Sequence, residues 1–184
     1  MPLDGSGGLR GLRGRRPEAP PAVDPDDRDA AAAMAQRLLA ITDRSRVELQ
    51  RRLERRGYAP ATAAEALDRL AARGWVDDAR VAEDLARRRL SRGYGRRRVL
   101  ADLVTRGIDA ETVSRTAAGI GEGQAEAVHL ATERLWHGRS GPPSPAELQR
   151  LAAALQRRGF DFADIRAELR RLSAGSTAPA DDQG

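Results

Sequence analysis

The segment "VELQRRLERRGY" at residues 47–58 decides the fold, because "RRVLADLVTRGI" at 97–108 and "LQRLAAALQRRGF" at 148–160 repeat its pattern. Each segment ends in Arg-Gly followed by a large apolar residue. The three glycines are Gly57, Gly107 and Gly159. Leu or Val stands four and eight positions before each glycine, a spacing that marks one face of a helix. The glycine is typical of a left-handed helix cap, after which the apolar residue folds back on the last turn.

The repeating unit is about 50 residues long, since the glycines are 50 and 52 residues apart. A second helical face follows each glycine, and a further helix precedes each segment, at roughly 29–41, 78–91 and 123–137. This gives nine helices in three units at 28–74, 75–120 and 121–173. One such unit buries a modest core, and stacked units stabilise one another. We therefore predict an all-α protein of three tandem three-helix repeats that form an elongated, curved helical array.

The connecting segments and the tails have a different composition. "GIGEG" at 119–123 predicts a flexible break between helices, and "HGRSGPPSP" at 137–145 predicts a long loop that ends where Pro145 begins a helix. Segments 1–27 and 174–184 are rich in Gly, Pro and charge and have no apolar periodicity, so we predict that both are disordered.

The composition limits the classes of function. The chain of 184 residues has no cysteine, which excludes disulfides and thiolate metal sites and fits a reducing cytoplasm. No apolar run is long enough to cross a bilayer, so no membrane association is expected. Residues 28–173 hold 28 Arg and 20 acidic residues, a net charge of +8, and the chain has no Lys. Such a basic core favours an anionic partner.

An enzyme is not indicated by any motif. His129 and His137 are eight positions apart, too far to share a metal without further ligands. The sequence has no nucleophile-elbow and no phosphate-loop pattern. Asp77 and Asp78 are explained more simply as a helix cap than as a catalytic pair. We predict neither catalysis nor a cofactor or metal.

The segment "RRRLSRGYGRRRV" at 87–99 contains seven arginines, no acid, and one tyrosine between two glycines. Two interpretations remain open: a solvated turn between basic helices, or a partner-binding surface. Tyr94 offers a ring for stacking, and Gly93 and Gly95 let a partner approach the backbone. The repeat itself does not require this Gly-Tyr-Gly sequence. The candidate binding residues are Arg87, Arg88, Arg92, Tyr94, Arg96, Arg97 and Arg98, with Arg46 and Arg52 in the first unit. We expect Trp75 to pack between units.

Four motifs carry a family resemblance. They are Ser-Arg-x-Glu-Leu at 45–49, Gly-Trp-x-Asp-Asp-x-Arg at 74–80, Arg-x-Tyr-Gly-x-Arg-Arg at 92–98 and "RRGFDFADIRAEL" at 157–169. In this order and spacing they resemble the RecX family of recombinase regulators, over about residues 36–172.

The resemblance implies a cytoplasmic, monomeric protein of three tandem three-helix repeats. It also implies a role in DNA repair, recombination and the SOS response. In that role the protein would bind the RecA filament on single-stranded DNA and restrain its ATPase, strand-exchange and coprotease activities, with DNA contacted directly or through the filament. The residues alone leave two alternatives: a nucleic-acid-binding module that acts without the recombinase, and a structural adaptor with a merely solvated arginine run.

Overall fold

The structure is a computed structural model that describes residues 23–137, 141 and 143–174. Over these residues the chain folds into nine α-helices and one 3₁₀ turn, and contains no strand. The elements are α1 (Arg28–Ile41), α2 (Arg46–Glu54), α3 (Pro60–Ala71), α4 (Asp78–Ser91), α5 (Arg96–Thr105), α6 (Ala110–Gly119), the turn η1 (Ile120–Gly123), α7 (Gln124–Trp136), α8 (Pro145–Arg157) and α9 (Phe162–Ala174). The predicted all-α class is confirmed. Most of the two predicted disordered tails and part of the 137–145 loop lie outside the described residues.

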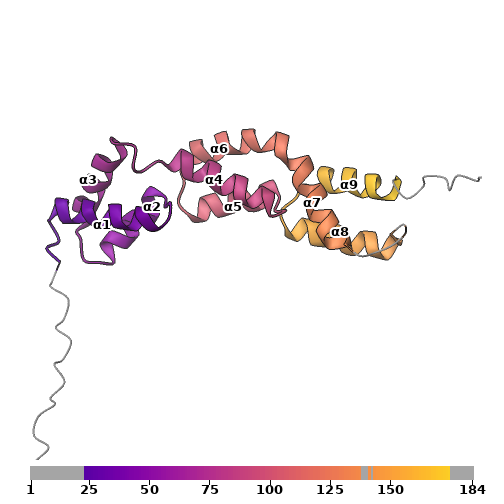
Figure 1. The fold of residues 1–184 in the computed structure, drawn as a ribbon, viewed down its shortest axis with the longest axis horizontal. Helices are drawn as coiled ribbons and strands as arrows, with labels where there is room; N and C mark the ends of the chain where they lie inside the picture. Colours follow the sequence, from indigo (N-terminus) through magenta and orange to yellow (C-terminus); the bar gives the residue numbers. More distant parts are fainter. Residues whose placement is uncertain (1–22, 138–140, 142, 175–184) are drawn as a thin grey trace, which may run out of the picture.

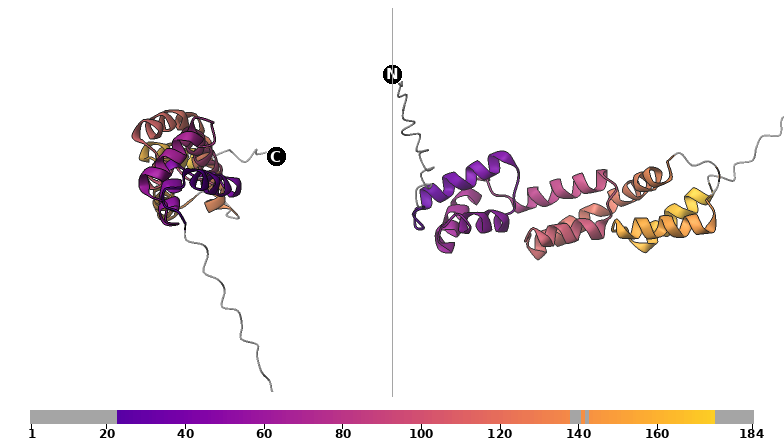
Figure 2. Two further views of the ribbon diagram at one scale, coloured as in Figure 1. Left: turned by 90° about the vertical axis from the view of Figure 1, so that its left-hand side faces the viewer. Right: turned by 90° about the horizontal axis from the view of Figure 1, so that it is seen from below.

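The helices form three groups of three, arranged in a row. Figure 1 shows α1–α3 at one end, α4–α6 in the middle and α7–α9 at the other end. The views in Figure 2 show that the molecule is long in one direction and narrow in the other two. Each group has its own cluster of buried apolar side chains. The predicted elongated array of three-helix repeats is therefore confirmed.

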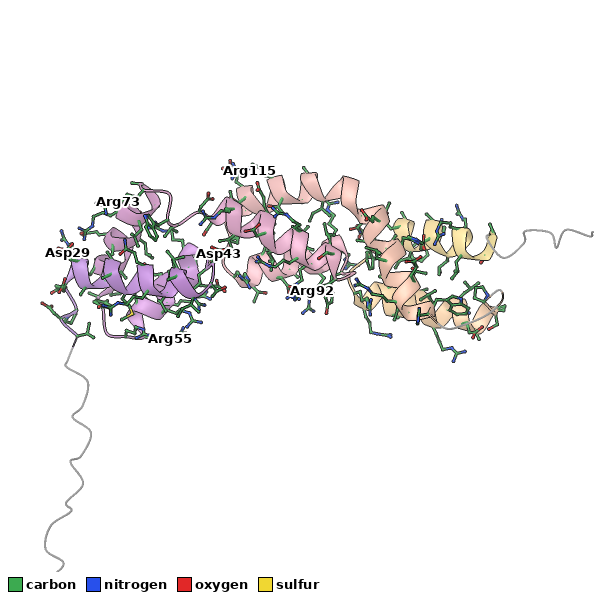
Figure 3. The ribbon with its side chains drawn as sticks, in the orientation of Figure 1. Asp29, Asp43, Arg55, Arg73, Arg92 and Arg115 are labelled. Carbon is green, nitrogen blue, oxygen red and sulfur yellow. The ribbon has the colours of Figure 1, made fainter. Side chains whose placement is uncertain are left out.

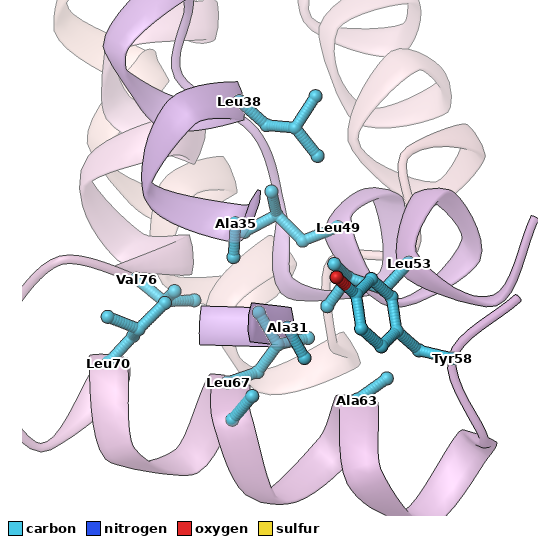
Figure 4. Close-up of a cluster of buried hydrophobic side chains, with 11 residues drawn as sticks. Ala31, Ala35, Leu38, Leu49, Leu53, Tyr58, Ala63, Leu67, Leu70 and Val76 are labelled. Carbon is cyan, nitrogen blue, oxygen red and sulfur yellow. The ribbon is translucent and has the colours of Figure 1, made fainter. Parts of the chain in front are cut away.

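The core of the first unit shows how the repeated residues work. Leu49 and Leu53 of α2 are completely buried, and Tyr58 folds back onto them from beyond the glycine (Figure 4). Small side chains of α1, such as Ala31 and Ala35, let the third helix approach closely. Ile108 and Phe160, which follow the other two glycines, are buried in the second and third cores. The interpretation of these apolar residues as cap and core residues is confirmed.

Caps fix where the helices begin and end. Ser45 and Ser144 each form a capping box, in which the serine hydroxyl accepts from the third helical N–H and a glutamate accepts from the serine N–H. The glycines at the ends of α2, α5 and α8 have φ angles of 101°, 75° and 88°, in the left-handed region. The predicted glycine caps are confirmed, so each second helix has a sequence-defined start and stop.

The first joint, where α5 meets α2, connects the first two units end to end. The Ser45 hydroxyl at the start of α2 donates to the Arg106 carbonyl at the end of α5, at 2.6 Å. The N–H of Arg46 donates to the Asp78 carboxylate of α4, at 2.8 Å. The C-terminal end of one helix therefore faces the N-terminal end of the other, and their dipoles attract.

The second joint, where α8 meets α5, repeats this arrangement. Gly95 donates its N–H to the Arg158 carbonyl at 2.9 Å, and the N–H of Arg96 donates to the Gln124 side chain at 3.1 Å. Gln124 is the first residue of α7, just as Asp78 is the first residue of α4. The helices α8, α5 and α2 therefore follow one another head to tail through two equivalent joints.

Both ends of this row are closed. In the two joints, the first N–H of the second helix donates to a side chain of the following unit. At one end of the row α8 begins with Pro145, which has no N–H and so needs no such acceptor. At the other end Val23 lies beside Gly57, and Ala59 donates its N–H to the Pro25 carbonyl at 2.9 Å. The contacts that join the units are therefore replaced by local ones at both ends of the row.

The segment at 119–123 differs from the prediction of a flexible break. Residues 120–123 form the 3₁₀ turn η1, which continues α6 directly into α7. Ile120 is buried in the second core and its N–H donates to the Thr116 carbonyl. Ile120 thus anchors the segment between its glycines.

The first joint yields a stability prediction at Asp78. Asp78→Ala should lower the free energy of unfolding by about 1 kcal/mol, because the N–H of Arg46 loses its acceptor. Asp78→Asn keeps a side-chain oxygen at the same place and should cost less. Burial raises the pKa of Asp78. The contribution of its carboxyl to stability is therefore full below the unfolded pKa of about 3.9 and lost as pH rises through the folded value.

Chemical denaturation at several pH values checks both parts. Relative to the wild type, Asp78→Asn should become more stable as the pH rises from about 3.5 to 7, since the asparagine carries no charge to desolvate. Equal losses for the Ala and Asn variants at every pH would show that the side chain does not cap α2.

Candidate partner-binding face

Three of the arginines in the 87–99 run lie in ion-pair range of two acids of the same chain. Arg87 pairs with Asp84 at 3.2 Å, and Arg98 pairs with Asp102 at 3.2 Å. Arg89 Nε lies 2.7 Å from Asp102 Oδ2, close enough for an ion pair, although the pair lacks hydrogen-bond geometry. Both acids lie just outside the run and reach it because residues three or four apart share a helix face. The run is less uniformly basic than its sequence indicates.

The remaining four arginines of the run are exposed. In the part of the chain that the structure describes, Arg88, Arg92, Arg96 and Arg97 form no ion pair. Arg51, Arg55 and Arg56 of the first unit are also exposed and unpaired there. In Figure 3 Arg55 and Arg92 lie along one long side of the molecule, while Arg73 and Arg115 lie along the opposite side. Helix spacing places Arg51 beside Arg55 and Arg88 beside Arg92. We call the seven arginines that are exposed and unpaired among the described residues, at 51, 55, 56, 88, 92, 96 and 97, the basic edge.

The two candidates from the first unit have different environments. Arg46 is tied to its own unit: its guanidinium pairs with Asp68 at 2.7 Å and donates to the Ala64 carbonyl at 3.4 Å. These contacts within the first unit explain why an arginine stands at position 46 without requiring a binding role. Arg52 is half-buried in α2, one turn after Glu48, and forms no ion pair among the described residues.

Tyr94 is half-buried and one face of its ring is covered from within the chain. The guanidinium carbon of Arg89 lies 5.2 Å from the ring centroid, a cation–π contact. The ring is therefore presented as part of an Arg–Tyr stack, with Arg89 held in turn by Asp102. A partner could therefore contact Tyr94 only on the part of the ring that Arg89 does not cover.

The glycines that flank Tyr94 have a structural role that the sequence reasoning missed. A Cβ on Gly95 would lie 2.4 Å from the backbone of Gly159 and Phe160. A Cβ on Gly93 would lie 3.1 Å from Ala131 of α7. The close approach that these glycines permit is therefore to the third unit of the same chain. The first joint has Asp43, Arg44 and Ser45 at the equivalent positions, so the two glycines serve the second joint and not the repeat in general.

Trp75 also differs from its prediction. It was expected to pack between units, but 48% of its surface is exposed. It borders a shallow cavity of about 300 Å³ together with Asp43, Arg73 and Arg80. The neighbouring Val76 is buried in the first core instead, so the chain places the smaller side chain inside.

A charged cluster holds α9 against α7 in the third unit. Arg171 binds both carboxylate oxygens of Glu168, at 2.7 and 2.9 Å, and His129 Nδ1 lies 3.1 Å from the same carboxylate. Burial raises the pKa of Glu168, but the hydrogen bonds from Arg171 and His129 outweigh it and hold that pKa below its usual range. Within the described ranges, no three His or acidic side chains are grouped so that they could hold a metal ion.

This fold defines a class: helical-repeat proteins, in which stacked units present an extended surface to a partner. No helix in the described part of the chain is long and apolar enough to span a bilayer.

Three family models match the three units. They are the first, second and third three-helix domains of RecX, at residues 31–70, 77–116 and 122–169. The chain belongs to the RecX family.

Relatives and solved structures agree with this assignment. "Regulatory protein RecX" of Xanthomonas campestris is 40% identical over 130 residues, which cover 70% of this chain and 79% of that protein. Its counterpart in Xanthomonas oryzae is 43% identical over 136 residues, 72% of this chain and 82% of that one. A RecX crystal structure from Lactobacillus salivarius shares the fold, with a TM-score of 0.73 at 19% identity, and the match covers 81% of this chain and 98% of that one. These relatives bear the name of a regulatory protein.

Proposed function

We propose that this protein binds the RecA filament on single-stranded DNA and restrains its ATPase, strand-exchange and coprotease activities. Membership of a family of regulatory proteins supports a regulatory role. A filament is a long partner, and a row of three units with closed ends suits contact along such a partner as a single chain. On this proposal the protein acts in the cytoplasm as a monomer.

The observation that carries the proposal is the basic edge. Its seven arginines lie in two groups, one in and just after α2 and the other from the last turn of α4 to the first turn of α5, so they occur on two units. Unpaired guanidinium groups bind carboxylates and phosphates in a bidentate way, and both groups are present on a filament of protein and DNA. The proposed contact residues are these arginines, with Tyr94 at the edge of the surface.

A recombinase ATPase assay on single-stranded DNA tests the proposal directly. Increasing amounts of this protein should reduce the rate of ATP hydrolysis at or below one copy per recombinase monomer. An unchanged rate at equimolar protein, with the protein shown to be folded, would contradict the proposal. Lysozyme, which is also basic, serves as the control for nonspecific competition between cations for DNA.

The second candidate is a nucleic-acid-binding module that acts without the recombinase. The same basic edge favours it, because arginines that neutralise phosphates release counterions. In that case affinity for an oligonucleotide alone should be high and should fall steeply with salt, and added recombinase should leave the affinity unchanged.

A further inference from the structure

The first joint contains a group of arginines with too little negative charge beside them. Arg44 directly precedes Ser45, whose hydroxyl donates to the Arg106 carbonyl at 2.6 Å. Arg52 stands one turn after Glu48 on α2, and the Glu48 carboxylate lies 3.9 Å from Arg106 Nη1. The three arginines thus come together around the start of α2, with Glu48 as the acid among them.

Glu48 is already occupied by its structural role. Its carboxylate accepts the N–H of Ser45 at 3.0 Å in the capping box of α2. The distance from the same carboxylate oxygen to Arg106 Nη1 is 3.9 Å, too long for a hydrogen bond. Among the described residues, no hydrogen bond is found between the Glu48 carboxylate and these arginines, and its single negative charge faces three positive ones.

Arg44 shows the consequence most clearly. Its Nε is shielded from solvent and has no hydrogen-bond partner. Burial lowers the pKa of Arg44, and the nearby positive charge of Arg52 lowers it further. A shielded donor without an acceptor is unfavourable unless a ligand or water supplies one. The group is thus prepared for an anion.

The second joint is built from the same positions but has an acid where the first has Arg52. When α2 and α5 are aligned from their first residues, Tyr94 corresponds to Arg44 and Asp102 to Arg52. Asp102 forms ion pairs with Arg89 and Arg98. The repeat therefore tolerates an acid at this position. The arginine of the first joint is not needed for the architecture.

We propose that Arg44, Arg52 and Arg106 bind one phosphate group of a single-stranded nucleic acid at the first joint. A phosphate presents several oxygens in a tetrahedral arrangement, which three guanidinium groups from different directions can share, whereas a carboxylate presents two in one plane. Arg51, Arg55 and Arg56 continue the positive charge along α2, so a backbone with further phosphates can follow. The assignment deepens the proposed function and rests on it for the nature of the partner.

Arg52→Asp tests the site, because it installs in the first joint the residue that the second joint already has. The matched control is Arg73→Asp, which makes the same change of charge at an exposed arginine on the other long side of the molecule (Figure 3). Binding of fluorescent dT15 is measured without recombinase across a range of salt concentrations. Arg52→Asp should weaken binding by roughly ten- to a hundredfold. It should also reduce the slope of log affinity against log salt by about 0.7, whereas Arg73→Asp should keep the slope.

Two further measurements make the result decisive. Inorganic phosphate should raise the thermal midpoint of the wild type more than chloride does at equal ionic strength, and Arg52→Asp should remove this difference while remaining folded. Equal losses of dT15 affinity in both variants would overturn the proposal. Displacement of dT15 by a glutamate-rich peptide at the same charge concentration would instead identify a carboxylate site and also overturn it. Because no recombinase is present, failure here leaves the ATPase result of the proposed function untouched.

Discussion

Gly95→Ala is expected to disrupt the contact between the second and third units. The φ angle of Gly95 is −86°, which alanine adopts readily, so backbone strain plays no part. The added Cβ would lie 2.4 Å from backbone atoms of Gly159 and Phe160, which cannot move without displacing the end of α8. We expect a loss of about 2–3 kcal/mol, the upper part of the range for overpacking.

Hydrogen exchange and chemical denaturation measure this effect. The N–H groups of Gly95 and Arg97, which bond to α8 carbonyls, should exchange faster, while amides in the first core remain protected. The control is Gly119→Ala in α6, where a Cβ meets no atom within 4 Å. Alanine there should be neutral or stabilise by about 0.5 kcal/mol. Equal stability of the two variants would show that the second joint is looser than the structure describes.

Arg96→Glu combined with Arg97→Glu is expected to abolish most of the inhibition of the recombinase. The change reverses two charges of the basic edge, and like charges facing an anionic partner are repelled. Both positions lie in the first turn of α5, where acidic side chains favour the helix dipole, so the fold should be retained. The half-inhibitory concentration in the ATPase assay should rise at least tenfold, which corresponds to about 1.4 kcal/mol.

The control for this pair is a second double variant on the other long side of the molecule. Arg73→Glu combined with Arg115→Glu changes the net charge equally, and both residues lie opposite Arg55 and Arg92 (Figure 3). This variant should inhibit nearly as well as the wild type. If both double variants lose inhibition to the same extent, net charge alone governs the interaction and the basic edge has no special part in it.

The fold could be predicted from the sequence because each unit carries its own signals. The residues before and after Gly57, Gly107 and Gly159 define one helix end, one apolar face and one cap, all within a single unit. The predicted bounds of the helix at 78–91 agree with α4. Helix periodicity and capping are local, so one sequence is sufficient to find them.

The candidate site could be predicted only in part, because its chemistry depends on contacts between units. The role of Gly95 depends on Gly159, 64 positions further along the chain, and no local pattern links the two. Arg106 comes close to the start of α2 in the same way, through a contact between residues 61 positions apart. Asp84 and Asp102 could have been found, since helix spacing places them beside Arg87 and Arg98. The binding roles of the exposed arginines and of Tyr94 remain predictions.

The proline that begins α8 removes the point of attachment that the two joints use. In those joints, the first N–H of a second helix donates to the unit that follows, and Asp78 or Gln124 provides the acceptor. Pro145 has no N–H to donate, so the start of α8 needs no neighbour of this kind. Lengthening the array at this end by duplication would therefore require replacing Pro145 as well as adding a unit.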